Sequence, residues 1–123
     1  MTVEIIEVVP TSPTSSEATL LLDDGKHQCR AFEHPRGSRI GALMKEPLLG
    51  FESRDVERDD SGPAGFTSDG TQLGCIVRGY VERVADPAIR VGSFVVELGL
   101  PLPGDIGIGD MVRFRCSRLD FMG

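Results

Sequence analysis

The stretch GCIVRGYVERVADPAIRVGSFVVEL, residues 74–98, indicates the fold more clearly than any other part of the sequence. In its first half, Cys75, Val77, Gly79 and Val81 alternate with a second set that holds most of the polar residues. Side chains of a strand point alternately to the two faces of its sheet, so this alternation predicts a strand over 74–84. A turn at Asp86-Pro87 then leads into a second predicted strand over 89–98, which bulges or bends at Gly92.

Strand patterns continue on both sides of this stretch. On the C-terminal side, MVRFRCSRLDF over 111–121 places Val112, Phe114 and Cys116 on one face. On the N-terminal side, the runs 17–23 and 26–32 flank Asp24-Gly25, a dipeptide typical of a tight hairpin turn, so we expect a hairpin there. The run TVEIIEVV over 2–9 predicts one more strand, with a bulge because its apolar pairs do not alternate.

The middle of the chain is ambiguous. Over 38–46, the residues Ile40, Leu43 and Met44 stand at helical spacing, and Pro47 would end the helix, so one short helix is predicted. A strand over part of 48–56 is an equally good interpretation. The polar, turn-rich segment 55–70 is expected to be a mobile surface loop.

These patterns predict a mostly β protein with a single domain over residues 1–123 and at most one short helix. Its 15 glycines and 8 prolines divide the chain into short apolar runs. A curved sheet with so few helices must cover its own apolar face, which favours a small antiparallel barrel, closed or partly open. The order of three strands, a short helix and two or three strands, with a turn at Gly109-Asp110 before the last, is similar to that of the OB-fold.

Composition limits the partners and the compartment. The chain carries 13 Lys and Arg against 19 Asp and Glu, a formal net charge of −6, which disfavours nucleic acid and anionic membranes and favours a basic protein partner. A local basic patch would still permit nucleic-acid binding. The three cysteines are odd in number and widely spaced, which suits buried thiols in a reducing compartment. We therefore expect a cytoplasmic protein.

Few residues suggest catalysis or metal binding. His27, Cys29 and His34 lie close together in the sequence but lack a fourth ligand at a suitable spacing, so no metal is predicted. Cys29, flanked by His27 and Arg30, is the one candidate for an activated thiol. The glycines of PGDIGIGD, residues 103–110, stand among aspartates that would repel a phosphate, so no cofactor is expected.

A binding face remains as the main candidate site. Arg113 and Arg115 share one side of their predicted strand, and Arg78 and Tyr80 share one side of theirs. A second candidate is the loop that contains His34, Arg36 and Arg39.

Together these features predict a small binding or assembly module that acts through a protein partner and not as an enzyme. Two alternatives stay open: an OB-type binder of single-stranded nucleic acid and a thiol-dependent enzyme centred on Cys29 and His27. An unpaired edge strand would also allow a homodimer.

Overall fold

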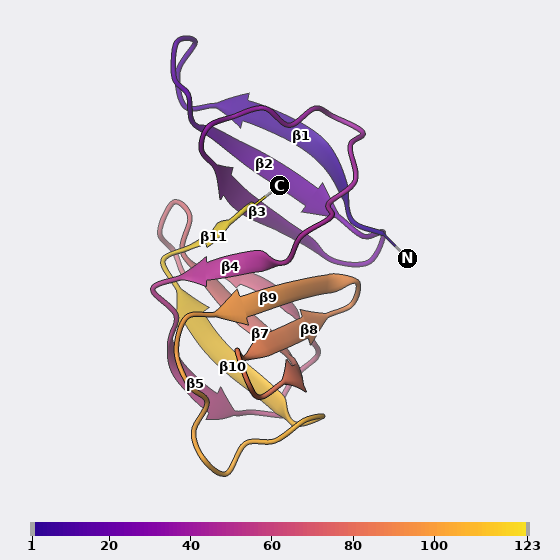
Figure 1. The fold of residues 1–123 in the computed structure, drawn as a ribbon, viewed down its shortest axis with the longest axis vertical. Coiled ribbons are helices and arrows are strands. Elements are labelled where there is room, and N and C mark those ends of the chain that lie inside the picture. Colours follow the sequence, from indigo (N-terminus) through magenta and orange to yellow (C-terminus); the bar gives the residue numbers. More distant parts are fainter. Residues whose placement is uncertain (1, 123) are drawn as a thin grey trace.

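A computed structural model describes residues 2–122, in which the chain forms strands and loops and no helix (Figure 1). In chain order the strands are β1 (Glu4–Pro10), β2 (Ala18–Asp23), β3 (Gln28–Glu33), β4 (Leu48–Phe51), β5 (Arg54–Arg58), β6 (Gly65–Ser68), β7 (Cys75–Arg83), β8 (Ala88–Val91), β9 (Phe94–Leu98), β10 (Met111–Cys116) and β11 (Arg118–Asp120). The prediction of a mostly β protein is confirmed.

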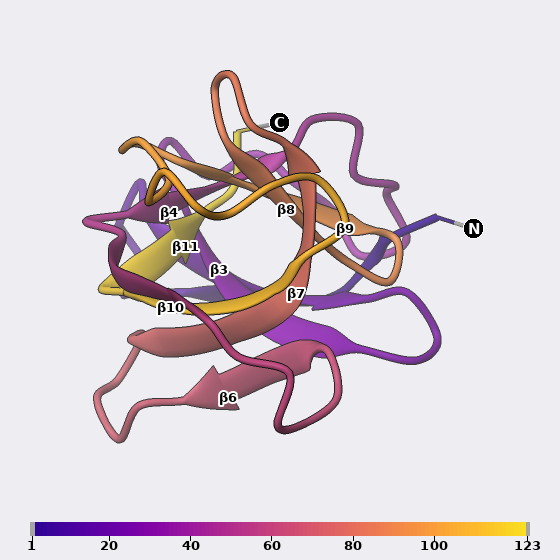
Figure 2. The same ribbon diagram turned by 90° about the horizontal axis from the view of Figure 1, so that it is seen from below.

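All eleven strands belong to one sheet. The order is β1-β2-β3-β11-β4-β9-β8-β7-β10-β5, and β6 pairs with β7 beside this path (Figure 2). Strands β1 to β3 lie together at the top of Figure 1, and the short β11 links them to the rest. In the described residues the pairings run as an open path from β1 to β5, so a closed barrel is not confirmed.

The expectation of purely antiparallel pairing is wrong at two places. Strand β4 pairs with β9 in parallel, and β11 pairs with β3 in parallel through Asp120 and Phe32. Both pairs join segments that are far apart in the sequence. Their relative direction is therefore set by the path of the whole chain and not by a local hairpin.

The predicted hairpin is confirmed. Strands β2 and β3 are antiparallel, with Leu22 opposite Cys29, and Gly25 adopts a φ of 92° in the turn, which a glycine accepts at little cost. The bulge expected in the first strand is also present, as a register shift between Ile5 and Glu7.

The short helix expected over 38–46 is wrong. In place of helical bonds, this segment lies along the outer edge of β1: Ala42 O accepts from Ile5 N at 2.9 Å, and Met44 N donates to Val3 O at 2.8 Å. Gly41 has a φ of 92°, outside the helical region, and Ile40 is 69% exposed. Hydrogen bonds to a distant strand thus satisfy the backbone here, and the apolar spacing does not mark a buried helix face.

The alternative interpretation, a strand over part of 48–56, is confirmed by β4 and β5, which a turn with Glu52 at a φ of 55° separates. The expectation of one loop over 55–70 is wrong, because this segment holds most of β5 and all of β6. Phe66 of β6 packs edge-to-face on Phe94 with ring centroids 5.0 Å apart, and this contact anchors an otherwise polar strand.

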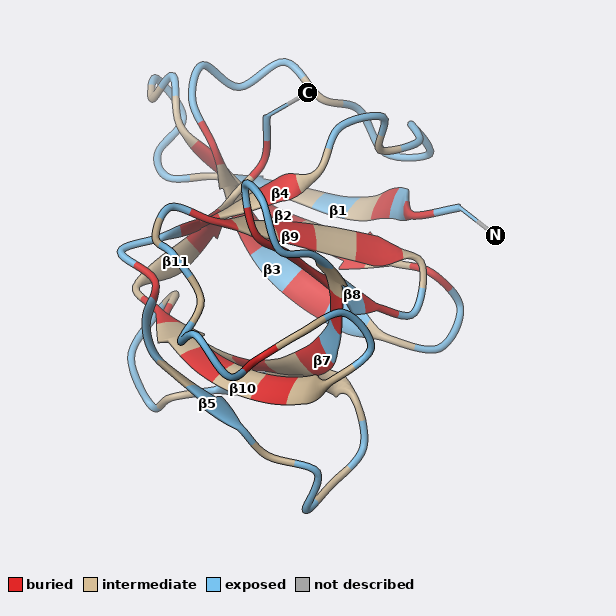
Figure 3. Cartoon of the chain, turned by 60° about the horizontal axis from the view of Figure 1, so that its bottom comes forward, coloured by how far each residue is buried: buried red, intermediate tan, exposed pale blue. Residues whose placement is uncertain are grey.

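The predicted alternation on the two clearest strands is confirmed. Cys75, Val77, Gly79 and Val81 of β7 are buried and alternate with more exposed residues, and the same alternation runs along β10 (Figure 3). The single strand expected over 89–98 is wrong in part: the bend at Gly92 is a full reversal, with a φ of 58°, and it separates β8 from β9.

Candidate functional site

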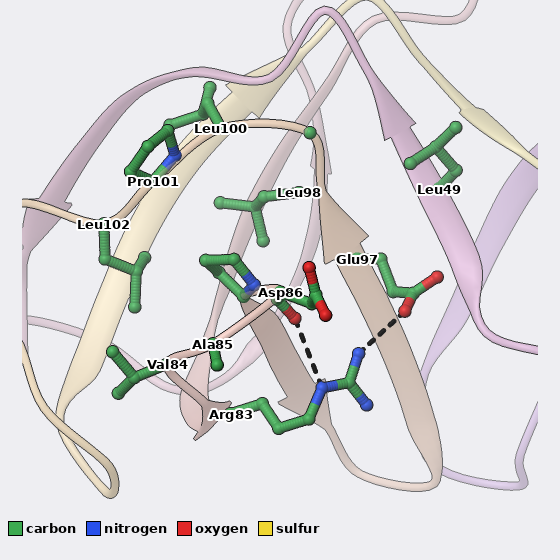
Figure 4. A pocket seen from close by; sticks show the side chains of 12 residues that line it. Leu49, Arg83, Val84, Ala85, Asp86, Glu97, Leu98, Leu100, Pro101 and Leu102 are labelled. Atoms are coloured by element: carbon green, nitrogen blue, oxygen red, sulfur yellow. Dashed lines mark hydrogen bonds and ion pairs between the residues drawn. The ribbon is translucent and has the colours of Figure 1, made fainter.

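An open groove of about 900 Å³ lies at one end of β9 (Figure 4). Its lining comes from β4, from the end of β7 and the turn that follows it, and from the end of β9 and the segment that follows it. The lining residues are Leu49, Arg83, Val84, Ala85, Asp86, Pro87, Glu97, Leu98, Gly99, Leu100, Pro101 and Leu102. Most of them are apolar, so the groove offers a hydrophobic surface to a ligand.

Two elements fix the walls of the groove. Leu98 N donates to Pro87 O at 3.0 Å, which ties the end of β9 to the β7–β8 turn. Beyond Leu98 the chain continues through Pro101, whose ring fixes φ and keeps the segment from forming a helix. Val84 in the turn is 45% exposed, a large fraction for an aliphatic side chain. Part of the apolar lining is therefore open to solvent, whereas Leu98 is buried.

The charged lining residues stand on one side of the groove. Arg83 Nη2 donates to Glu97 Oε2 at 2.7 Å, and Arg83 Nε donates to the backbone oxygen of Asp86 at 3.2 Å (Figure 4). Asp86 has a φ of 49°, a conformation that aspartate tolerates better than most residues. One cationic and two anionic side chains give this lining a formal net charge of −1.

The groove holds little that could perform chemistry. Its titratable side chains are Arg83, Asp86 and Glu97, and the lining contains no thiol, hydroxyl or imidazole. Such a surface can bind apolar groups through burial and can orient a charged group at its edge.

The structure brings the predicted arginines Arg78 and Arg113 together, directly opposite each other on β7 and β10. Acidic side chains accompany them. Arg78 Nη2 lies 3.0 Å from Asp59 Oδ2, Arg113 Nε lies 3.6 Å from the same oxygen, and Arg113 also pairs with Glu57. Hydrogen bonds from Ser61, followed by that from Arg78, hold the pKa of the Asp59 carboxyl well below its ordinary value. These carboxylates reduce the positive charge expected on this face.

The other two residues of the predicted face, Tyr80 and Arg115, form no ion pair within residues 2–122. Tyr80 is 50% exposed and stands opposite Met111 of β10. Arg115 stands opposite Arg54 of β5, and no carboxylate within residues 2–122 forms an ion pair with it. A binding role for the face Arg78, Tyr80, Arg113 and Arg115 stays a prediction.

The predicted loop residues follow β3. The Nδ1 atom of His34 lies 3.3 Å from Ser16 Oγ, and Arg36 N donates to Ser16 O at 2.6 Å. Beneath them the buried carboxylate of Glu33 accepts from the backbone of Gly37 at 3.1 Å and from the Ser38 hydroxyl. The loop is thus organised around its own polar contacts. His34, Arg36 and Arg39 are exposed.

The three cysteines are buried free thiols. Burial raises the pKa of Cys29 well above its ordinary value, and the neighbouring Cys75 and Cys116 raise it further. Burial also raises the pKa of Cys75 to about 11 and that of Cys116 to about 12. Because the thiolate is the nucleophile, such thiols react slowly at neutral pH.

The sequence reasoning missed the groove. From the sequence alone no role is assigned to residues 99–102, and Leu100 and Leu102 are not identified as lining of a binding surface. One signal was present: the run LGLPLP, residues 98–103, holds three leucines where a solvent-exposed connection is usually polar.

Within residues 2–122, no group of three or more His, Cys, Asp or Glu side chains is placed to hold a metal ion. The same part of the chain has no helix of the length and hydrophobicity that a membrane crossing requires. Comparison with known proteins found no matching family model, no matching curated protein and no matching solved structure.

Proposed function

We propose that this protein is a non-enzymatic binding module that acts through a protein partner, and that the groove is its contact surface. The observation that carries the proposal is the groove itself: about 900 Å³ of open space lined mainly by leucine, valine, proline and alanine. A small-molecule site usually encloses most of its ligand. An open apolar surface of this size suits the side chains of another protein.

The charge of the groove indicates the character of the partner. Its lining carries a formal net charge of −1, and the whole chain carries −6. A partner segment that is apolar with adjacent basic residues would match both features, because complementary charges favour encounter and orientation.

The chemistry of the thiols supports a non-enzymatic role. Since the pKa of Cys29 is raised by burial, a thiol-dependent enzyme centred on Cys29 and His27 would need an activation that this environment opposes. The presence of three unpaired thiols also supports our placement of the protein in the cytoplasm.

The proposal includes an OB-like, partly open barrel as the frame of the module. In its support, β10 pairs with β7, and after Ser117 the chain continues into β11, which pairs with β4. The strands before and after Ser117 thus belong to the same curved sheet.

The test compares the wild type with two apolar-to-acidic variants in partner capture. Val84→Glu places a charge in the groove, and Ile108→Glu makes the same kind of change at a side chain that is 73% exposed and lies outside the groove. Each tagged protein is incubated with lysate of its native cell, and the captured proteins are quantified by mass spectrometry. We expect at least one partner whose recovery falls about tenfold or more with Val84→Glu and is unchanged with Ile108→Glu, as for loss of a central apolar contact. Equal recovery with all three proteins would refute the proposal.

A further inference from the structure

The edge of the groove contains a carboxylate without a cation. Asp86 is exposed, and within the described residues no Lys, Arg or His side chain lies within 4 Å of its carboxylate oxygens. Its backbone oxygen, in contrast, is occupied by Arg83 Nε. The side chain is therefore free to meet a ligand, while the backbone that carries it is held in place.

The neighbouring arginine is already committed to other acceptors. Arg83 donates through Nη2 to Glu97 and through Nε to the Asp86 carbonyl. The ion pair is about half exposed, with side-chain exposures of 45% and 41%, so its contribution to stability is small. The ion pair acts mainly on position: it holds the Arg83 guanidinium at Glu97 and not at the Asp86 carboxylate (Figure 4).

Apolar surface borders this negative position directly. Val84 lies on the same turn as Asp86, and Leu100 and Leu102 line the groove with them (Figure 4). Lysine and arginine can lay their aliphatic stems on such a surface and bring the charged head to a carboxylate. Arginine can in addition make two parallel hydrogen bonds to it.

From this juxtaposition we infer that the groove recognises a partner segment in which a lysine or arginine stands within a few residues of a bulky apolar side chain. The apolar residue lies on the surface formed by Val84, Leu100 and Leu102, and the basic residue pairs with Asp86. Because Glu97 is paired with Arg83, Asp86 supplies the net negative charge of this lining. This inference rests on the proposed function. In it, Asp86 makes the groove prefer apolar segments that carry a lysine or arginine over those that do not.

The test is a selection from a displayed library of random twelve-residue peptides. The targets are the wild-type protein, Asp86→Asn, and Asp60→Asn, which removes the same charge from an exposed residue outside the groove lining. Val84→Glu is included to identify the peptides that bind in the groove. Circular dichroism verifies that each variant is folded.

We expect the wild type and Asp60→Asn to enrich peptides that combine a basic and a bulky apolar residue. With Asp86→Asn the basic residue should lose its enrichment. Synthetic copies of the enriched peptides should bind Asp86→Asn about three- to tenfold more weakly than wild type in fluorescence polarisation, and less salt-dependently, because an edge charge contributes modestly and through a screened interaction.

The other outcomes separate this inference from the proposed function. If the selected peptides lose binding with Val84→Glu but show no preference for Lys or Arg, the groove binds apolar segments and the role of Asp86 is wrong. If no selected peptide depends on Val84, the groove is not a docking site, and both the proposed function and the inference are overturned. Equal effects of Asp86→Asn and Asp60→Asn would show a general charge effect and would also overturn the inference.

Discussion

Replacing Asp24 by Asn should remove a hydrogen-bonded link between two distant turns. Asp24 is only 6% exposed, although it is charged. Its Oδ1 accepts from Lys26 N at 2.9 Å and His27 N at 2.6 Å in its own turn, and its Oδ2 accepts from Ser93 N at 2.9 Å in the β8–β9 turn. The carboxylate therefore holds the β2–β3 hairpin against the other part of the sheet.

The magnitude follows from the number of acceptors. An asparagine side chain has one acceptor oxygen where the carboxylate has two, so one side of the link must face a backbone N–H with an NH₂ group. Losing a hydrogen bond to a charged acceptor and leaving a buried donor unsatisfied costs about 2 kcal/mol. For a chain of 123 residues this corresponds to a decrease in Tm of about 8 °C.

The effect should depend on pH. Burial alone would raise the pKa of Asp24, but hydrogen bonds from the backbone N–H groups of Ser93, His27 and Lys26 outweigh burial and lower it. A carboxyl with a lowered pKa in the folded state stabilises the protein above its unfolded pKa of about 3.9. That stabilisation is lost as the pH falls through the folded-state pKa, so wild type and Asp24→Asn should converge at low pH.

Urea denaturation followed by circular dichroism, at neutral pH and at several acidic values, measures both effects. Asp23→Asn is the matched control, because Asp23 accepts one exposed hydrogen bond, from Gly25 N at 2.8 Å. The control should change the free energy of unfolding by no more than about 0.5 kcal/mol. The reasoning is refuted if Asp24→Asn is as stable as Asp23→Asn at neutral pH, or if its deficit persists unchanged in acid.

Three further predictions concern the core, the β11 junction and the thiols. Gly79→Ala should lower the free energy of unfolding by about 2 kcal/mol in the same denaturation assay, because the new Cβ would lie 2.4 Å from a backbone oxygen of β8. Gly37→Ala is the control and should be nearly neutral, because a Cβ there would have no atom within 4 Å. Arg118→Lys should lower Tm by about 4 °C, which corresponds to about 1 kcal/mol. The guanidinium lies 4.4 Å from the ring centroid of Phe32 and 4.3 Å from that of Phe51, and an ammonium group cannot stack on both rings. An unchanged Tm would contradict this. All three cysteines should react with Ellman's reagent at pH 7.5 far more slowly in the folded protein than in urea, because burial raises their pKa values, and one rapidly reacting thiol would contradict the non-enzymatic interpretation.

Features that depend on neighbouring residues could be predicted from the sequence. Alternation over 74–84 and in the first part of 111–121 correctly predicted the buried faces of β7 and β10, because side-chain direction in a strand has a period of two. The β2–β3 hairpin followed from Asp24-Gly25, because glycine tolerates the positive φ of the turn. These are short-range constraints, and they require no knowledge of the rest of the chain.

Local patterns predicted the arginines of the binding face but not the carboxylates that pair with them. Placing Arg78 and Arg113 side by side was correct, because both positions follow strand alternation. The carboxylates of Glu57 and Asp59 that pair with them come from a segment expected to be a loop. Its hydrogen bonds to β10 involve residues more than fifty positions away, and no local pattern predicts them.

The amino-acid sequence alone determined that this protein is built from short strands, which of their residues face inward, and that its surface is acidic. Tertiary structure alone decided the strand order, the parallel pairs and the groove, whose lining includes Leu49, Val84 and Leu102 from three separate segments. The physical reason is the range of the interactions. Backbone conformation and side-chain alternation are fixed within a few residues, whereas burial and strand pairing depend on which distant segments the folded chain brings together.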